Sequence, residues 1–162
     1  MPDPTAPRFD RRHDGRFDVN LSELDLENLT VVVADLVDDL DGSPDSEDLS
    51  RLHPPAYTDN ADRQMEYQLL AGEELRSSRR NGIETSLAIL ELSVITEEQL
   101  WALLRTLNSV RLVTGTRLGI DEDIHHPPKL WFRLPPQTKR LWAVYLFSSE
   151  LLGEATYALM SD

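Results

Sequence analysis

One short run of acidic residues and histidines has the side chains best suited to binding a metal ion. Asp121, Glu122, Asp123, His125 and His126 place five potential ligands within six positions. Carboxylates and imidazoles bind zinc, manganese or nickel when a rigid framework orients them. The run precedes two prolines and has no histidine pair at helical spacing, so a solvated loop is the more ordinary interpretation. We keep Asp121, Asp123, His125 and His126 as metal candidates and assign no cofactor and no catalytic residue.

A second feature is an arginine on an apolar helix face. Arg111 shares a stripe with Leu104, Leu107 and Thr114. An unpaired charge there is costly to bury, so a carboxylate partner is expected, and Glu66 is the candidate. A structural ion pair between Glu66 and Arg111 is the favoured interpretation, and a ligand-binding arginine is the alternative.

Three arginines and one aromatic segment are candidate binding surfaces. Arg76, Arg79 and Arg80 share one face if their segment is helical, and that face suits an acidic partner or a phosphate. The segment 129–133, Lys-Leu-Trp-Phe-Arg, either folds back on the protein or exposes an apolar patch. Each of the three tryptophans, at positions 101, 131 and 142, is expected in the core or at its rim.

Other chemistry lacks support. No nucleophile elbow, GxxxxGK[ST] or GxGxxG motif occurs. The absence of cysteine removes disulfides, thiolate metal sites and thiol redox switches. No signal peptide or apolar membrane span is recognisable, which predicts a cytoplasmic protein.

The net charge of −13 is concentrated in one region. Residues 18–62 hold thirteen acidic residues against one basic residue, whereas residues 63–162 are nearly balanced. This field disfavours membrane association and direct nucleic-acid binding, and it favours a partner with a basic surface. The candidate acidic partner surface consists of Asp35, Asp38, Asp39 and Asp41.

The periodicity predicts an all-α, single-domain orthogonal bundle of five to six helices over residues 17–162. Residues 1–16 are expected to be a disordered or loosely ordered arm, and the alternation at Phe17 and Val19 predicts a short extended segment. The first helix spans about 25–40 and a short one about 43–52. Asp59 or Asn60 caps a helix that breaks near Gly72, and a second helix covers about 73–92. Further helices span about 96–118, which begins with a Thr96-x-x-Gln99 capping box, and about 135–159.

Several short segments carry a family resemblance. They are 51–59 (RLHPPAYTD) with a following Glu66, 107–112 (LNSVRL), 116–120 (TRLGI), 144–146 (VYL) and 150–152 (ELL). In order and spacing, over about residues 17–160, they resemble the actinobacterial domain-of-unknown-function family numbered two thousand and seventeen. The resemblance implies a cytoplasmic helical protein without an assigned enzymatic activity, often encoded near the Clp-protease adaptor ClpS. The oxidative-stress regulation that is described for some members through a cysteine pair cannot apply to a chain without cysteine.

The leading hypothesis is a non-enzymatic regulatory or adaptor-like module that binds a protein through its acidic N-terminal surface. A small-molecule or metal-dependent enzyme or sensor built on Glu66, Arg111 and the His125/His126 loop is one alternative. A transcription regulator that acts through a protein partner is another. Spare apolar positions at Leu146 and Phe147 also permit a homodimer.

Overall fold

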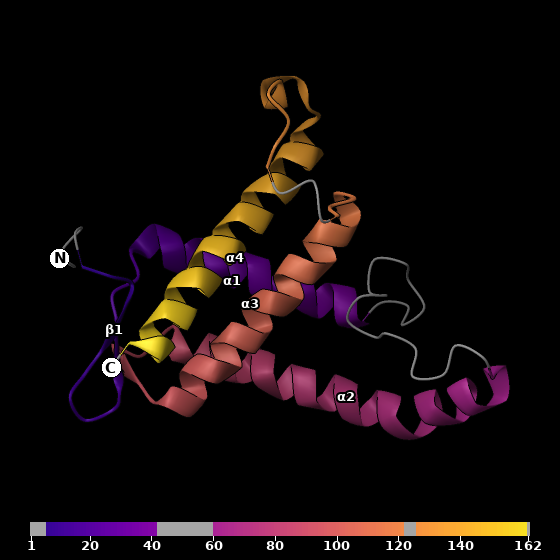
Figure 1. Ribbon diagram of the computed structural model, residues 1–162, viewed down its shortest axis with the longest axis horizontal. Helices are drawn as coiled ribbons and strands as arrows, with labels where there is room; N and C mark the ends of the chain where they lie inside the picture. The colour runs from indigo at the N-terminus through magenta and orange to yellow at the C-terminus, as the bar shows by residue number, and fades with distance from the viewer. Residues whose placement is uncertain (1–5, 42–59, 122–125, 162) are drawn as a thin grey trace.

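The computed structural model describes residues 6–41, 60–121 and 126–161 (Figure 1). Within these ranges, the side chains of residues 40, 41, 64, 66–73, 75 and 76 are outside the description. The predicted helix over 43–52 also lies outside it. The elements are β1 (Phe9–Arg11), β2 (Phe17–Val19), α1 (Glu23–Asp41), α2 (Ala61–Ile89), β3 (Val94–Ile95), α3 (Glu97–Arg117), the 3-10 helix η2 (Trp131–Arg133) and α4 (Pro136–Met160).

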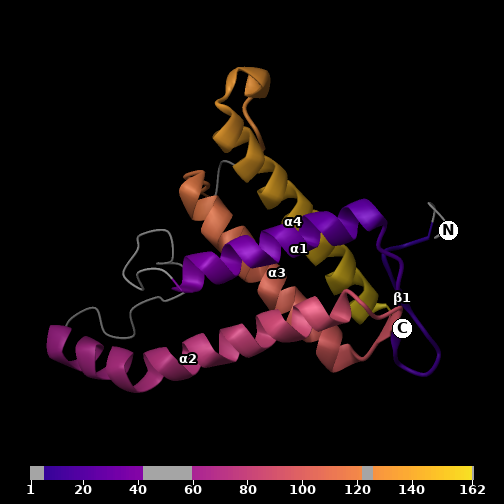
Figure 2. The same ribbon diagram turned by 180° about the vertical axis from the view of Figure 1, so that it is seen from behind.

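The four α-helices of the described residues form two crossed pairs. Seen from behind, α1 and α2 run across α3 and α4 (Figure 2). Helix α3 packs most extensively against α4 and then against α2, so it lies at the centre of the protein. Leu100, Leu103 and Leu107 of α3 are completely buried, as are Leu29 of α1 and Leu151 of α4. The helical bundle predicted from apolar periodicity is therefore present.

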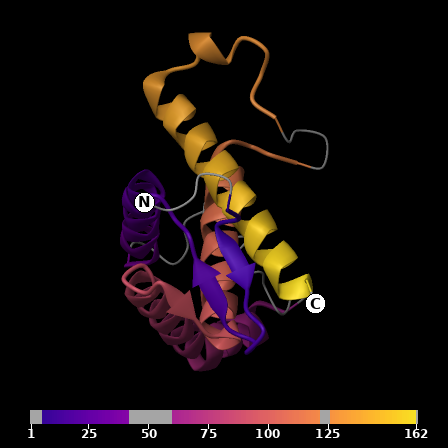
Figure 3. The ribbon, with the colours of Figure 1, turned by 90° about the vertical axis from the view of Figure 1, so that its left-hand side faces the viewer.

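The strict all-α expectation needs a correction, because three short antiparallel strands form a sheet in the order β1-β2-β3 (Figure 3). Phe17 of the central strand pairs with Ile95 and is fully buried, and Phe9 of β1 is 3% exposed. Phe9 lies within the arm expected over residues 1–16, so part of that arm is ordered structure. Strands of two or three residues are too short to show a recognisable alternation of apolar and polar residues in the sequence. The extended segment predicted at Phe17 and Val19 is confirmed.

The helix ends mostly follow local sequence rules. The Thr96/Gln99 capping box begins α3, and Asn60 accepts hydrogen bonds from two amides at the start of α2. Gly119, with φ of 65°, ends α3, where Ile120 N donates to Gly115 O and Gly119 N donates to Thr116 O. The break predicted near Gly72 is wrong, because α2 is continuous. A single glycine without an adjacent proline costs a helix only about 1 kcal/mol, which tertiary packing readily offsets.

Candidate functional site

The 3-10 helix η2 and the residue before it carry three large apolar side chains away from the helical body. Leu130, Trp131 and Phe132 are 53%, 54% and 56% exposed, respectively. We call these three residues the aromatic tip. The tip projects beyond the crossed helices, at the top of Figures 1 and 3. Of the two interpretations of segment 129–133, the structure therefore has the exposed patch and not the loop folded back on the bundle.

Local hydrogen bonds and a small apolar cluster hold the base of the tip. Trp131 N donates to Pro128 O at 2.8 Å, and Leu134 N donates to Trp131 O at 3.0 Å. Leu134 then packs against a cluster in which Trp142 and Tyr145 meet edge to face, with ring centroids 5.8 Å apart. Pro136 suits the first turn of α4, because that position needs no amide donor. The exposed side chains thus stand on an ordered support.

Cations surround the aromatic tip. Lys139 Nζ lies 5.9 Å from the centre of the Trp131 ring, and Arg133 Cζ lies 5.8 Å from that of Phe132. Lys129 is also exposed. Cations over aromatic faces help to order both groups and leave a surface that is apolar at its centre and positive at its edge. Such a surface complements an apolar pocket with an acidic rim.

The other two tryptophans differ in burial. Trp142 is 6% exposed and belongs to the cluster below the tip, whereas Trp101 on α3 is 44% exposed. The expected core or rim position therefore describes Trp142, whereas Trp101 is exposed. Trp131 is a further exception, because it lies at the end of a projection.

Arg111 lies close to the same cluster. Its Cζ is 5.8 Å from the centre of the Tyr145 ring, and its buried Nε has no hydrogen-bond partner among the residues that the structure describes. The predicted partner Glu66 is in α2, but its side chain is outside the description. The Glu66–Arg111 ion pair therefore stays a prediction.

Two of the acidic residues predicted as a partner surface pair with arginines of the same chain. Asp35 accepts from Arg140 Nη2 at 2.9 Å, and Asp39 accepts from Arg117 Nη2 at 2.6 Å. These pairs connect α1 to α4 and α3 across a hollow of about 220 Å³. Asp38 is exposed, and the side chain of Asp41 is outside the description. Local pairing reduces the negative field of this part of α1, and the basic partner stays a prediction.

The arginine face of α2 points partly inward. Arg79 is half-buried and lines a hollow between α2 and α3, whereas Arg80 is exposed. Burial lowers the pKa of Arg79, because desolvation disfavours the charged guanidinium. The Arg76 side chain is outside the description, so a shared face of all three arginines stays a prediction.

The predicted metal run falls largely outside the description. Asp121 and His126 are exposed, while Asp123 and His125 belong to the excluded range 122–125. In the described part of the chain, no group of three histidine, aspartate or glutamate side chains is placed to hold a metal ion. The enzyme or sensor that would combine this loop with Glu66 and Arg111 stays a prediction.

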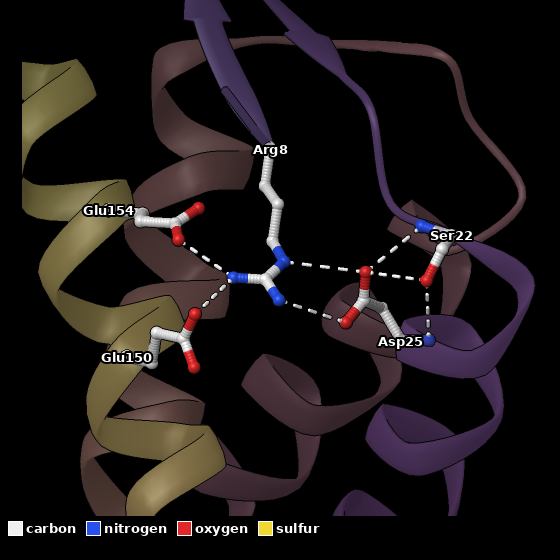
Figure 4. Close-up of polar contacts among 5 residues, drawn as sticks. All are labelled: Arg8, Ser22, Asp25, Glu150 and Glu154. Atoms are coloured by element: carbon white, nitrogen blue, oxygen red, sulfur yellow. Dashed lines mark hydrogen bonds and ion pairs between the residues drawn. The ribbon is translucent and has the colours of Figure 1, made fainter. Parts of the chain in front are cut away.

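Sequence reasoning missed an ion cluster around Arg8 (Figure 4). Arg8 Nη1 donates to Glu150 Oε1 at 2.8 Å and to Glu154 Oε1 at 2.7 Å. Its Nε and Nη2 donate to the two carboxylate oxygens of Asp25, both at 3.3 Å. Three carboxylates from α1 and α4 therefore surround one guanidinium just before β1. The i, i+4 spacing of the two glutamates was a local signal, but the position of Arg8 depends on the tertiary fold.

Ser22 prepares Asp25 for this contact. Ser22 N and Oγ donate to Asp25 Oδ2 at 3.0 and 2.7 Å, and Asp25 N donates to Ser22 Oγ. Partial burial, the largest single influence, would raise the pKa of Asp25. The hydrogen bonds from Ser22 and then from Arg8 outweigh it and hold the pKa below its ordinary value. A Ser-x-x-Asp capping box, readable at residues 22–25, could have located the start of α1.

The described residues define a mostly helical protein with a small sheet and a projecting aromatic tip. None of its helices in that part of the chain is long and apolar enough to cross a membrane. The chain belongs to the family described as Domain of unknown function (DUF2017), whose model matches residues 6–159. Comparison with curated proteins and with solved structures found no match.

Proposed function

We propose that the protein is a non-enzymatic, regulatory or adaptor-like interaction module that binds a protein partner through the aromatic tip. The observation that carries the proposal is the exposure of three consecutive large apolar side chains, each by more than half, on an ordered support. Exposed apolar groups gathered in this way are typical of interaction surfaces. Tryptophan and phenylalanine supply large contact areas with few rotatable bonds, which favours strong contacts on binding.

The partner that fits the tip has an apolar pocket with acidic residues around it. Lys129, Arg133 and Lys139 would then speed association and set the orientation of the complex, while Trp131 and Phe132 would contribute most of the affinity. This differs from the basic partner expected from charge composition. The difference arises because the cations of the nearly balanced C-terminal part gather around the tip, whereas Asp35 and Asp39 are paired within the chain.

The first stage of the experiment identifies a partner that touches the tip. A photo-crosslinking amino acid is placed at position 131 in native cells, and the adduct is identified by mass spectrometry. Position 157 is the matched control, because Tyr157 is also an exposed aromatic residue, 77% exposed, on α4. A partner that is captured from position 131 and not from position 157 is then purified.

The second stage measures affinity with that purified partner. Trp131→Ala and Phe132→Ala are each expected to weaken binding by at least about tenfold, the effect typical of an interface hot spot, whereas Tyr157→Ala leaves it unchanged. Raising the salt concentration is expected to slow association because it screens the lysines and arginine. Unchanged affinity in both tip variants would refute the proposal. So would specific binding of the tip to anionic vesicles or single-stranded DNA without a protein partner.

A further inference from the structure

A polar hollow lies between α2 and α3, away from the aromatic tip. Its volume is about 260 Å³, and its polar lining consists of Ser78, Arg79, Arg105, Thr106, Asn108 and Ser109. Leu36 of α1, with Ile83 and Leu112, supplies an apolar wall. A second hollow of about 340 Å³ adjoins it and shares Ser78, Gly82 and Arg105 with it. We call these two neighbouring hollows along the α2–α3 contact the trough.

The charge in this trough is opposite to that of the whole protein. Two guanidinium groups, one from each helix, line the first hollow, and none of the described residues that line it is acidic. Arg105 is exposed, and its guanidinium group makes no hydrogen bond or ion pair with the other described residues. Arg79 is half-buried, and its lowered pKa reflects the cost of desolvating its charge. An anion between the two helices would interact favourably with both guanidinium groups.

Polar groups beside the arginines are suited to completing the site. Ser78 is on α2 next to Arg79, and Asn108 is three residues beyond Arg105, so both are on the helix faces that border the hollow. Neither side chain has a hydrogen-bond partner among the described residues. Their hydroxyl and amide groups can donate hydrogen bonds to a phosphate oxygen. A buried hydrogen bond connects α2 and α3 near the hollow: Ser86 Oγ donates to Thr106 Oγ1 at 2.9 Å.

We propose that this trough binds a small phosphorylated polyol, such as a sugar phosphate, with its phosphate group between Arg79 and Arg105. Two guanidinium groups match the charge of a phosphate monoester, and each can form paired hydrogen bonds with its oxygens. The second hollow presents Asn81, Thr85 and Gln99, whose amide and hydroxyl groups suit a hydroxylated body. Glu98 also borders it and disfavours a second anionic group there.

Isothermal titration calorimetry of the full chain tests the site with three probes: glucose 6-phosphate, glucose and inorganic phosphate, at constant ionic strength. Glucose 6-phosphate is expected to bind and glucose is not. Inorganic phosphate is expected to bind more weakly than the sugar phosphate, because it leaves the second hollow unfilled. Arg105→Gln and Arg79→Gln are each expected to raise the Kd for glucose 6-phosphate by at least about tenfold. Arg63→Gln, an exposed arginine near the start of α2, is the matched control and is expected to leave the Kd unchanged.

Three results would overturn the proposal. The first is the absence of binding of either phosphate compound up to about 10 mM, a limit that covers even weak metabolite sites. The second is equal binding by Arg105→Gln, Arg79→Gln and Arg63→Gln. The third is equal binding of glucose and glucose 6-phosphate. Arg105 is exposed, so its variant is expected to fold normally, as circular dichroism would verify. If Arg79→Gln fails to fold, Arg79→Lys replaces it, since lysine keeps the charge but loses the paired hydrogen bonds. All of these variants leave the aromatic tip intact, so the outcome is independent of the partner experiment.

Discussion

Replacing Arg8 by glutamine removes the one cation that is shared by Asp25, Glu150 and Glu154. In the wild-type protein, this arginine joins the segment before β1 to the start of α1 and to the C-terminal half of α4 (Figure 4). Glutamine is polar but two bonds shorter than arginine, so the variant removes both the charge and the guanidinium fork. The three carboxylates then face one another without a counterion among the described residues, and Arg8→Gln is expected to destabilise the protein.

The size of the effect follows from exposure and distance. The Asp25 side chain is 13% exposed, and its two contacts with Arg8 are long, at 3.3 Å, so the loss there is about 1 kcal/mol. Glu154 is 35% exposed and 2.7 Å away, which adds about 0.5–1 kcal/mol. Glu150 is 59% exposed, so solvent screens it and it adds little. The free energy of unfolding should fall by about 2 kcal/mol, which lowers the Tm by about 4–8 °C for a chain of this size.

The loss should depend on pH, with a sign that follows from Asp25. The folded state holds the pKa of Asp25 below its ordinary value, so its stabilising contribution is complete above the unfolded pKa, near about 4. That contribution disappears as the pH falls through the folded pKa. Removing Arg8 weakens it, and the repulsion among the three carboxylates of the variant grows as they ionise. The difference between wild type and variant should therefore be largest near neutral pH and shrink toward acid.

Urea unfolding followed by circular dichroism, at pH values from about 2 to 7, measures this difference directly, because the window includes the range below the unfolded pKa of Asp25. Arg16→Gln is the matched control, because the Arg16 side chain hydrogen-bonds to its near neighbour Asp14 in the exposed β1–β2 turn and its loss should leave the unfolding midpoint unchanged. A midpoint for Arg8→Gln equal to that of the wild type at neutral pH would refute the reasoning. A difference that stays constant down to acid pH would show that the loss arises from packing and not from ionised carboxylates.

Three further changes test the core, a helix end and the Glu66–Arg111 pair. Leu103→Ala should lower the free energy of unfolding by about 2–5 kcal/mol, because Leu103 is completely buried in the central helix; a urea midpoint within error of the wild type would contradict this. Thr96→Ala removes the hydroxyl that accepts from Gln99 N and should cost about 1 kcal/mol by thermal melting, whereas Thr96→Ser should retain most of that stability. For the predicted ion pair, Glu66→Gln, Arg111→Met and the double variant form a cycle that should give a coupling of about 1 kcal/mol or more; additive changes in the free energy of unfolding would rule the pair out.

Much of the helical framework could be predicted, because its signals are local. Apolar residues at helical spacing located α1, a capping box began α3, and a glycine with positive φ ended it. The sheet could not be predicted in the same way, since β2 pairs with β3 more than seventy residues later and each strand is too short to carry a period of its own. The interruption expected at Gly72 is absent, because a single glycine weakens a helix by only about 1 kcal/mol and α2 continues through it.

The candidate sites show the same division. The residue types at 129–133 were visible in the sequence, but whether the segment folds back or projects depends on Leu134 and the Trp142/Tyr145 cluster that supports it. Composition located the negative charge on residues 18–62. It could not show that Asp35 and Asp39 meet arginines of α4 and α3, since those contacts span 105 and 78 positions.

By itself, the sequence determined the helical periodicity, the helix ends, the lack of thiol chemistry and the family, since each depends on residue type or on spacing within a few turns. Only the tertiary structure decided which charges are paired, which aromatic residues are exposed, and that Arg79 and Arg105 line one trough. These properties depend on how distant helices cross, and a crossing is determined by packing over the whole core rather than by any single segment.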